Sequence, residues 1–132
     1  MIKLGVGIIG AGWVAGEHIR AFQSNPHTEV RAICSRNEAR AKAKSLECGV
    51  RCELFTDHEK MLAMDGVDIV AVATPPNVHR VQAVAAAQAG KHLLLEKAMA
   101  TTLEDARAIR DAVAKAGVKS VVSFVLRWNP LF

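Results

Sequence analysis

The clearest candidates for chemistry in this sequence are the glycines near its start. Gly10-x-Gly12-x-x-Ala15 follows an apolar run, residues 2–9, and precedes a helical pattern. In a strand, turn and helix of this kind, the first glycine makes the tight turn, the second leaves room for phosphate oxygens, and a small third residue lets the helix lie on the strand. The free N–H groups and the dipole of the helix start then attract the anion. The pattern predicts a dinucleotide pyrophosphate site at Gly10, Ala11, Gly12, Trp13 and Val14.

A second glycine pattern overlaps the first, but it fits the surrounding residues less well. Gly5-x-Gly7-x-x-Gly10 has the same spacing. It would leave only four residues for the preceding strand and would place Ile8 and Ile9 in a helix. We therefore expect the turn to begin at Gly10.

The end of the second expected strand indicates which dinucleotide binds. In NAD sites an acidic residue, about twenty residues beyond the glycines, binds the hydroxyl groups of the adenine ribose. Here the strand ends in Ile33-Cys34-Ser35-Arg36, with no Asp or Glu at its tip. Ser35 can donate a hydrogen bond to a 2′-phosphate, and Arg36 can pair with that phosphate or stack on adenine. The sequence therefore favours NADP over NAD, and the nearby Glu38 keeps NAD as the open alternative.

Strands and helices alternate along the whole sequence, and these elements must position the candidate residues. Apolar runs predict strands at residues 2–9, 28–35, 50–55, 68–73, 92–95 and 120–126. Helical patterns occupy residues 13–24, 58–64 and 77–89, Asn37 can cap another helix, and Thr101-x-x-Glu104 is a capping box for the last. Strands joined by helical crossovers predict an α/β fold, a Rossmann-type doubly wound six-stranded parallel sheet in the order 3-2-1-4-5-6.

Composition limits the classes of function. The chain has 132 residues, the length of about one domain, and its net charge of +4 is spread along it without aromatic interleaving, so we expect no nucleic-acid partner. No apolar stretch approaches the ~20 residues of a membrane span, so no membrane association is expected. The odd count of three cysteines indicates reduced thiols and a cytoplasmic protein. Cys48-x-x-x-Cys52 has no matching second pair, so we expect no metal site.

Four segments carry a resemblance to one family. These segments are Gly10-Ala11-Gly12-Trp13-Val14-Ala15, Ala73-Thr74-Pro75-Pro76-Asn77-Val78-His79, Ala89-Gly90-Lys91-His92-Leu93-Leu94-Leu95-Glu96-Lys97-Ala98 and Arg127-Trp128-Asn129-Pro130. In order and spacing the chain resembles the N-terminal half of the Gfo/Idh/MocA oxidoreductases, named for glucose–fructose oxidoreductase, inositol dehydrogenase and the rhizopine-catabolism enzyme. The resemblance implies an NAD(P)-dependent dehydrogenase or reductase acting on a sugar, polyol or related hydroxy compound.

The resemblance also implies roles for particular residues. Thr74, Pro75 and Asn77 would line the cofactor cleft, and Glu96 and Lys97 would lie near the nicotinamide. Lys97 would be the catalytic lysine, which handles the hydroxyl proton of the substrate; otherwise Glu96 and Lys97 are an exposed pair that closes a strand. His79 would line the cleft or cap the following helix. The full set of cofactor-binding residues expected is Gly10, Ala11, Gly12, Trp13, Val14, Ser35, Arg36, Thr74, Pro75, Asn77, His79, Glu96, Lys97 and Arg127.

Two departures from the family pattern leave an alternative open. The family usually has proline after the lysine, where this chain has Ala98, so Lys97 is aimed differently if that proline aims it. Residues 1–126 match the NAD(P)-binding domain, residues 127–132 read as the start of a C-terminal α/β substrate domain, and the rest of that domain is absent from this sequence. We therefore expect the chain alone to bind cofactor without turnover. We also expect it to form homo-oligomers. The alternatives are a stand-alone NAD(P)-binding regulatory or redox-sensing module and a biliverdin-reductase-like protein.

Overall fold

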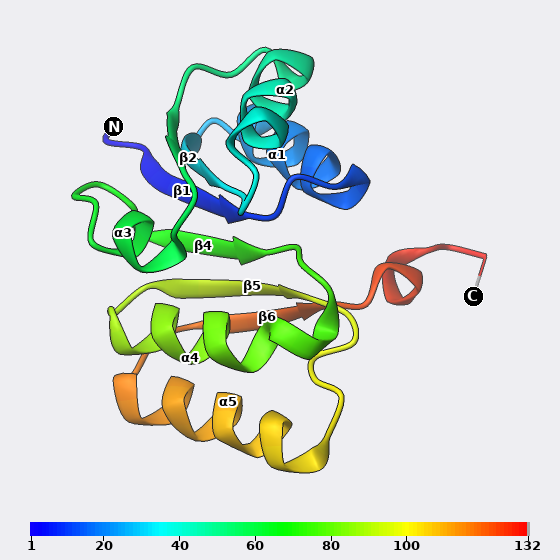
Figure 1. Cartoon of the computed structure of the whole chain (residues 1–132). Helices are drawn as coiled ribbons and strands as arrows, with labels where there is room; N and C mark the ends of the chain where they lie inside the picture. Colours follow the sequence, from blue (N-terminus) through cyan, green and yellow to red (C-terminus); the bar gives the residue numbers. More distant parts are fainter. Residues whose placement is uncertain (132) are drawn as a thin grey trace.

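Parallel strands form the middle of the molecule, and helices cover both faces of the sheet (Figure 1). The computed structural model describes residues 1–131. The sheet has six strands in the order β3-β2-β1-β4-β5-β6, and all neighbouring strands are parallel. The strands are β1 (Leu4–Ile9), β2 (Thr28–Cys34), β3 (Glu53–Phe55), β4 (Ile69–Val72), β5 (His92–Glu96) and β6 (Ser120–Ser123). The predicted doubly wound α/β fold and its strand order are confirmed.

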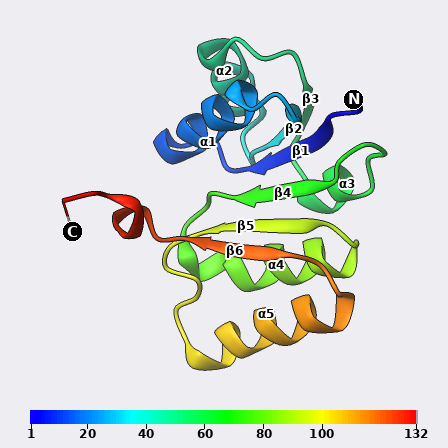
Figure 2. The same cartoon turned by 180° about the vertical axis from the view of Figure 1, so that it is seen from behind.

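The helices divide between the two faces of this sheet. Helices α1 (Trp13–Ser24) and α2 (Glu38–Cys48) pack on one face, and α3 (His58–Leu62), α4 (His79–Gln88) and α5 (Leu103–Ala116) pack on the other, as the two opposite views show (Figures 1 and 2). Two short 3-10 helices are η1 (Pro76–Val78) and η2 (Val125–Trp128). Within residues 1–131 no helix has both the length and the apolar character that crossing a membrane requires.

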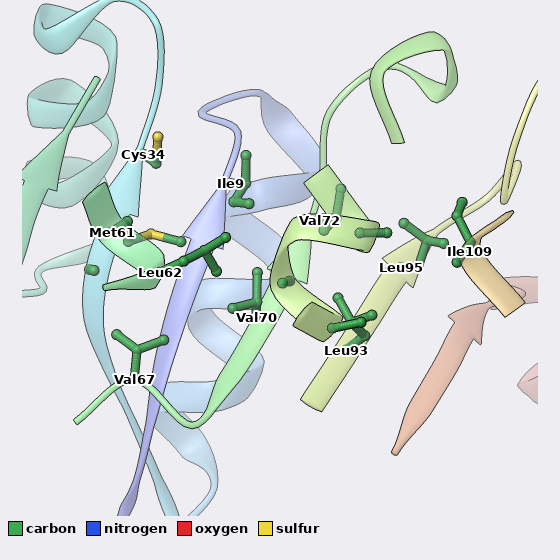
Figure 3. Close-up of a cluster of buried hydrophobic side chains, with 14 residues drawn as sticks. Ile9, Cys34, Met61, Leu62, Val67, Val70, Val72, Leu93, Leu95 and Ile109 are labelled. Carbon is green, nitrogen blue, oxygen red and sulfur yellow. The ribbon is translucent and has the colours of Figure 1, made fainter. Parts of the chain in front are cut away.

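Each face of the sheet has its own hydrophobic core, because successive side chains of a strand point to opposite faces. Beneath α3, α4 and α5, the buried Met61 and Leu62 meet strand residues such as Val70 and Val72 (Figure 3). The core residues that helix α4 buries completely are all alanines, namely Ala83, Ala86 and Ala87. Their small size lets the helix backbone lie close to β4 and β5.

The side chains that cap the helix N-termini are those that the sequence predicts, with one exception. The side chain of Asn37 accepts a hydrogen bond from the backbone of Arg40 at the start of α2. At α5 the capping side chain belongs to Thr102, which accepts from the backbone N–H of Asp105. The predicted capping box at Thr101 is therefore wrong by one residue. Both threonines offer the same hydroxyl, so residue type alone could not choose between them.

Several predicted boundaries are also corrected. Strand β6 ends at Ser123 rather than at residue 126, because its partner β5 ends at Glu96, directly opposite Ser123. The predicted helix 77–89 is divided into η1 and α4, since Pro76 opens a 3-10 turn. Strand β1 begins at Leu4, strand β3 has only three residues, and α3 ends at Leu62. Strand propensity alone predicts strands that are too long, because an apolar run can continue beyond the last residue for which a neighbouring strand offers hydrogen bonds.

After β6 the chain leaves the sheet with its apolar side chains exposed, and its end projects away from the body of the domain (Figure 1). The side chains that are more than half exposed there are Phe124, Val125, Leu126, Trp128 and Leu131. Phe132, which the sequence places in the same apolar segment, lies outside the described residues. An apolar surface of this kind promotes association between copies of a chain.

We expect the chain to self-associate as its concentration rises. Trp128→Glu should raise the dissociation constant about tenfold or more, because it replaces an apolar aromatic anchor by a charge. Sedimentation velocity over a concentration series measures this. Leu46→Glu, at an exposed site on α2, is the matched control and should leave the profile unchanged. A strict monomer at high concentration would contradict the expectation.

Candidate functional site

A groove of about 750 Å³ runs along the carboxyl edge of the sheet. Its walls come from the ends of β1, β2 and β4, the first turn of α2, the segment after β3, and the start of the β4–α4 connection. In doubly wound sheets this edge binds ligands where the strand order reverses, which here is between β1 and β4. The lining residues are Ile9, Gly10, Ala11, Gly12, Cys34, Ser35, Arg36, Asn37, Arg40, Thr56, His58, Ala73, Thr74, Pro75, Asn77, Val78 and Gln82.

The glycine turn forms the centre of this groove. Gly10 has a φ of 120°, and a Cβ there would lie 2.5 Å from the carbonyl oxygen of Ala73. A Cβ on Gly12 would meet no atom of residues 1–131 within 4 Å. Gly10 is therefore required by the fold, whereas Gly12 leaves space that the protein does not use.

The other two glycines of the overlapping pattern have a different role. Gly5 and Gly7 lie inside β1. A Cβ on Gly5 would lie 1.7 Å from the carbonyl oxygen of Gly66, and one on Gly7 would lie 2.9 Å from the Met61 side chain. These two positions serve packing within the fold, and the turn begins at Gly10.

Helix α1 starts directly after the turn, with Gly12 as its N-cap. The N–H groups of its first turn, including those of Trp13 and Val14, are among those that a helix leaves without helical partners, so they are suited to an anion. The Trp13 side chain is 78% exposed, and the Val14 side chain packs partly against the core beneath α1. Neither side chain lines the groove, so these two residues can contribute through their backbone.

Positive charge surrounds the end of β2. Ser35, Arg36 and Arg40 line the groove there. Glu38 is exposed and does not line it, and among residues 1–131 the lining contains no Asp or Glu. Burial raises the pKa of the Cys34 thiol to about 11, so Cys34 is an uncharged wall of the groove at neutral pH.

One ring nitrogen in the same region lacks a protein partner. His58 begins α3 and lines the groove, and its buried Nε2 atom has no hydrogen-bond partner within residues 1–131. Buried polar atoms are normally satisfied, so an unpaired one at a groove is suited to a ligand atom or water.

The end of β4 supplies three predicted residues to the groove, namely Thr74, Pro75 and Asn77. The Thr74 hydroxyl is hydrogen-bonded to the side-chain carbonyl of Gln82 on α4. His79 is fully buried instead of lining the groove, and its Nε2 atom lies 2.7 Å from the carbonyl oxygen of Thr74. It makes no side-chain cap for α4. His79 therefore supports the groove from behind.

The end of β5 continues the same edge beyond the groove. Glu96 is 6% exposed, and its Oε1 atom lies 2.6 Å from Nε2 of His18 on α1. Lys97 is exposed, and the peptide bond between Lys97 and Ala98 is cis. Neither Glu96 nor Lys97 is among the lining residues of the groove. They lie one strand further along the edge, where the second half of a dinucleotide would extend.

The last predicted residue, Arg127, lies apart from the groove lining. It belongs to the exposed helix η2, and its guanidinium lies 5.8 Å from the centre of the Trp128 ring. The structure thus brings most predicted residues to one edge of the sheet and leaves Arg127 on the departing chain.

Sequence reasoning missed several residues of this edge. Arg40 follows the cap residue Asn37 by three positions, so the capping pattern could have placed it in the first turn of α2, beside the strand tip. His18 follows the buried Ala15 by three positions, which puts both on the inner side of α1. Thr56, His58 and Gln82 carry no pattern of this kind and depend on the folded arrangement.

Comparison with known proteins agrees with this arrangement. The family model described as "Oxidoreductase family, NAD-binding Rossmann fold" (Gfo/Idh/MocA) matches residues 4–124. The chain is 34% identical over 123 residues to D-apiose dehydrogenase of Paraburkholderia graminis, covering 93% of this chain and 32% of that protein. It is 36% identical over 126 residues to D-xylose 1-dehydrogenase (NADP(+)) 2 of Haloferax volcanii, covering 95% of this chain and 38% of that protein.

Solved structures show the same likeness. The WlbA dehydrogenase from Bordetella pertussis, solved in complex with NADH and UDP-GlcNAcA, superposes with a TM-score of 0.89 at 34% identity and covers 97% of this chain and 39% of that one. The chain spans about a third of the length of the curated relatives it matches. With its fold, glycine turn and family match taken together, the chain belongs to the Gfo/Idh/MocA oxidoreductase family, as an NAD(P)-binding Rossmann domain.

Proposed function

We propose that this chain binds NADP(H) in the groove and provides the cofactor half of an oxidoreductase that acts on a sugar, polyol or related hydroxy compound. The observation that carries the proposal is the empty space above Gly12, where a Cβ would meet nothing within 4 Å among residues 1–131. The free N–H groups of α1 face that space, and the unpaired Nε2 of His58 lies further along the same groove. The residues present therefore fit a dinucleotide.

The preference for NADP over NAD is supported by the charges at the end of β2. NAD sites use a carboxylate there to bind both ribose hydroxyls, and such a carboxylate would repel a 2′-phosphate. Here Arg36 and Arg40 line the groove, and the lining within the described residues has no carboxylate. The Ser35 hydroxyl accepts a weak bond from the backbone of Asn37 at 3.3 Å, which leaves its proton available for a phosphate oxygen.

The side chains beyond the groove suit the proposed reaction. When bound, the cofactor supplies hydride transfer. Lys97 is exposed at the end of β5, where its Nζ can hold the substrate oxygen and take up or release the hydroxyl proton. Glu96, which directly precedes Lys97 in the chain, is fixed by His18. The relatives named as D-apiose and D-xylose dehydrogenases support a sugar or polyol as substrate.

Replacing Arg36 tests the cofactor preference. Arg36→Ala should weaken NADPH binding by about 1–3 kcal/mol, the scale of a charge-assisted contact. The same change should leave NADH binding nearly unaltered, since NADH has no 2′-phosphate. Titration calorimetry on the chain with each dinucleotide measures both.

The matched control is Arg107→Ala, at an exposed site on α5 outside the groove, which should alter neither affinity. Equal losses for NADPH and NADH in Arg36→Ala would sink the proposed preference. Failure of the unmodified chain to bind either dinucleotide would refute the proposed function as a whole.

A further inference from the structure

A buried pair of side chains connects α1 to the end of β5. His18 Nε2 lies 2.6 Å from Glu96 Oε1, and the two side chains are 13% and 8% exposed. Because a carboxylate accepts and does not donate, the proton of this bond belongs on Nε2 of His18. A short hydrogen bond to a carboxylate at a site that is largely shielded from water is stronger than an ordinary hydrogen bond on the surface.

The position of this pair in the sheet gives it a larger role than local packing. Helix α1 follows β1, and β5 is separated from β1 by β4. The bond therefore connects β5 with the helix that follows β1, a strand two positions away in the sheet. Glu96 points to this face because Leu94, two residues earlier on β5, packs with the core beneath α1.

A side chain on the opposite face of the sheet also contacts the segment after Glu96. His79 begins α4, and its Nδ1 atom lies 3.3 Å from the carbonyl oxygen of Met99. Its Nε2 atom lies 2.7 Å from the carbonyl oxygen of Thr74, so that ring stands between the end of β4 and the segment after β5. In the sequence, Lys97 lies between Glu96, which His18 contacts, and Met99, which His79 contacts.

We propose that His18 is a positioning residue for the nicotinamide side of the cleft, which it holds in place by fixing Glu96 and hence the start of the segment that presents Lys97. This inference rests on the proposed function. The groove shaped by the glycine turn and the end of β2 serves the adenosine and pyrophosphate portion, whereas the end of β5 lies one strand beyond it. Loss of the His18 bond should therefore affect only the nicotinamide portion of a ligand.

Two substitutions separate the hydrogen bond from the volume of the ring. His18→Leu removes the donor and keeps an apolar side chain, whereas His18→Gln places an amide N–H near the position of Nε2. His27→Leu is the matched control, because His27 is an exposed histidine outside the site. Circular dichroism and the thermal midpoint show whether each variant folds.

The first measurement needs no ligand. Hydrogen exchange at the amides of Leu95 and Glu96, which lie in the β5 ladder, should become about tenfold faster in His18→Leu, since local opening is no longer opposed by the buried bond. Exchange in β1 and β2 should stay as in the unmodified chain, and His18→Gln should restore slow exchange at Leu95 and Glu96. If exchange there is unchanged in His18→Leu, or rises equally throughout the sheet, His18 does not fix this segment.

The second measurement compares a whole dinucleotide with a fragment that lacks nicotinamide. His18→Leu should weaken NADPH binding about tenfold, the scale of one charge-assisted hydrogen bond, and change binding of 2′-phospho-ADP-ribose less than twofold. His18→Gln should recover most of the NADPH affinity, and His27→Leu should alter neither. Equal losses for the two ligands, or none, would overturn the inference. That result differs from failure of the proposed function, in which the unmodified chain itself binds neither ligand.

Discussion

Gly12→Ala is expected to fold like the unmodified chain and to lose most of its affinity for the dinucleotide. The added methyl group would meet no atom of residues 1–131 within 4 Å, so the native backbone can accept it. It would occupy the space through which, in the proposed site, pyrophosphate oxygens approach the free N–H groups of α1. Phosphates displaced by the methyl group would lose hydrogen bonds that these N–H groups donate to their charged oxygens. We therefore expect a loss of about 2–3 kcal/mol in binding free energy, or roughly 30- to 150-fold in affinity.

Calorimetry with NADPH measures the affinity, and urea denaturation measures the free energy of unfolding. Gly49→Ala is the matched comparison, because Gly49 also has open space around it but ends α2 with a φ of 65°. That change should lower stability by about 1 kcal/mol and leave affinity unchanged. Unaltered NADPH binding in Gly12→Ala would show that the pyrophosphate does not lie over the glycine turn.

Gly10→Ala is expected to have the opposite effect, a large loss of stability. Its φ of 120° is strained for any residue with a side chain, and the new Cβ would lie 2.5 Å from the Ala73 carbonyl oxygen. Ala73 cannot easily retreat, because its own N–H is hydrogen-bonded to the Ile9 carbonyl. Relief of the clash must separate the ends of β1 and β4. We expect the free energy of unfolding to fall by about 3–5 kcal/mol.

The midpoint of urea unfolding measures this loss, and the slope of the transition shows whether the same folded state is being compared. Ala11→Ser, at the next position of the turn, is the control and should cost less than about 1 kcal/mol. A midpoint for Gly10→Ala within error of the unmodified chain would mean that the turn can rearrange freely.

The strand order could be predicted because local patterns and chain connectivity agree throughout this sequence. The glycine turn marks the end of β1, and the helical crossovers require parallel strands with right-handed connections. Boundaries were less predictable, because they depend on where a neighbour stops. Nothing in residues 120–126 shows that β5 ends opposite Ser123, and Thr101 and Thr102 offer the same capping group.

The groove residues could be predicted where backbone geometry requires a particular residue type, and they could not be predicted where they depend on contacts between distant residues. Gly10 and Gly12 can be recognised in the sequence because the glycine turn pattern requires glycine itself at both positions. The pairing of His18 with Glu96 joins residues 78 positions apart, and no periodicity in either segment marks it. His79 was expected at the cleft or as a helix cap, yet its ring is buried behind Thr74. Only the packing of α4 against the sheet determines that placement.

The central place of β1 in the sheet also has a consequence for folding during synthesis. Strand β1 is synthesised before both of its partners, and it can pair with β2 on one side while its other side waits for β4. At translation rates of about 5–20 residues per second, the roughly 35 residues between Cys34 and Ile69 take about 2–7 s to emerge. During that time the apolar edge of β1 beside the glycine turn is open to chaperones or to another nascent chain. Slower translation would lengthen this exposure.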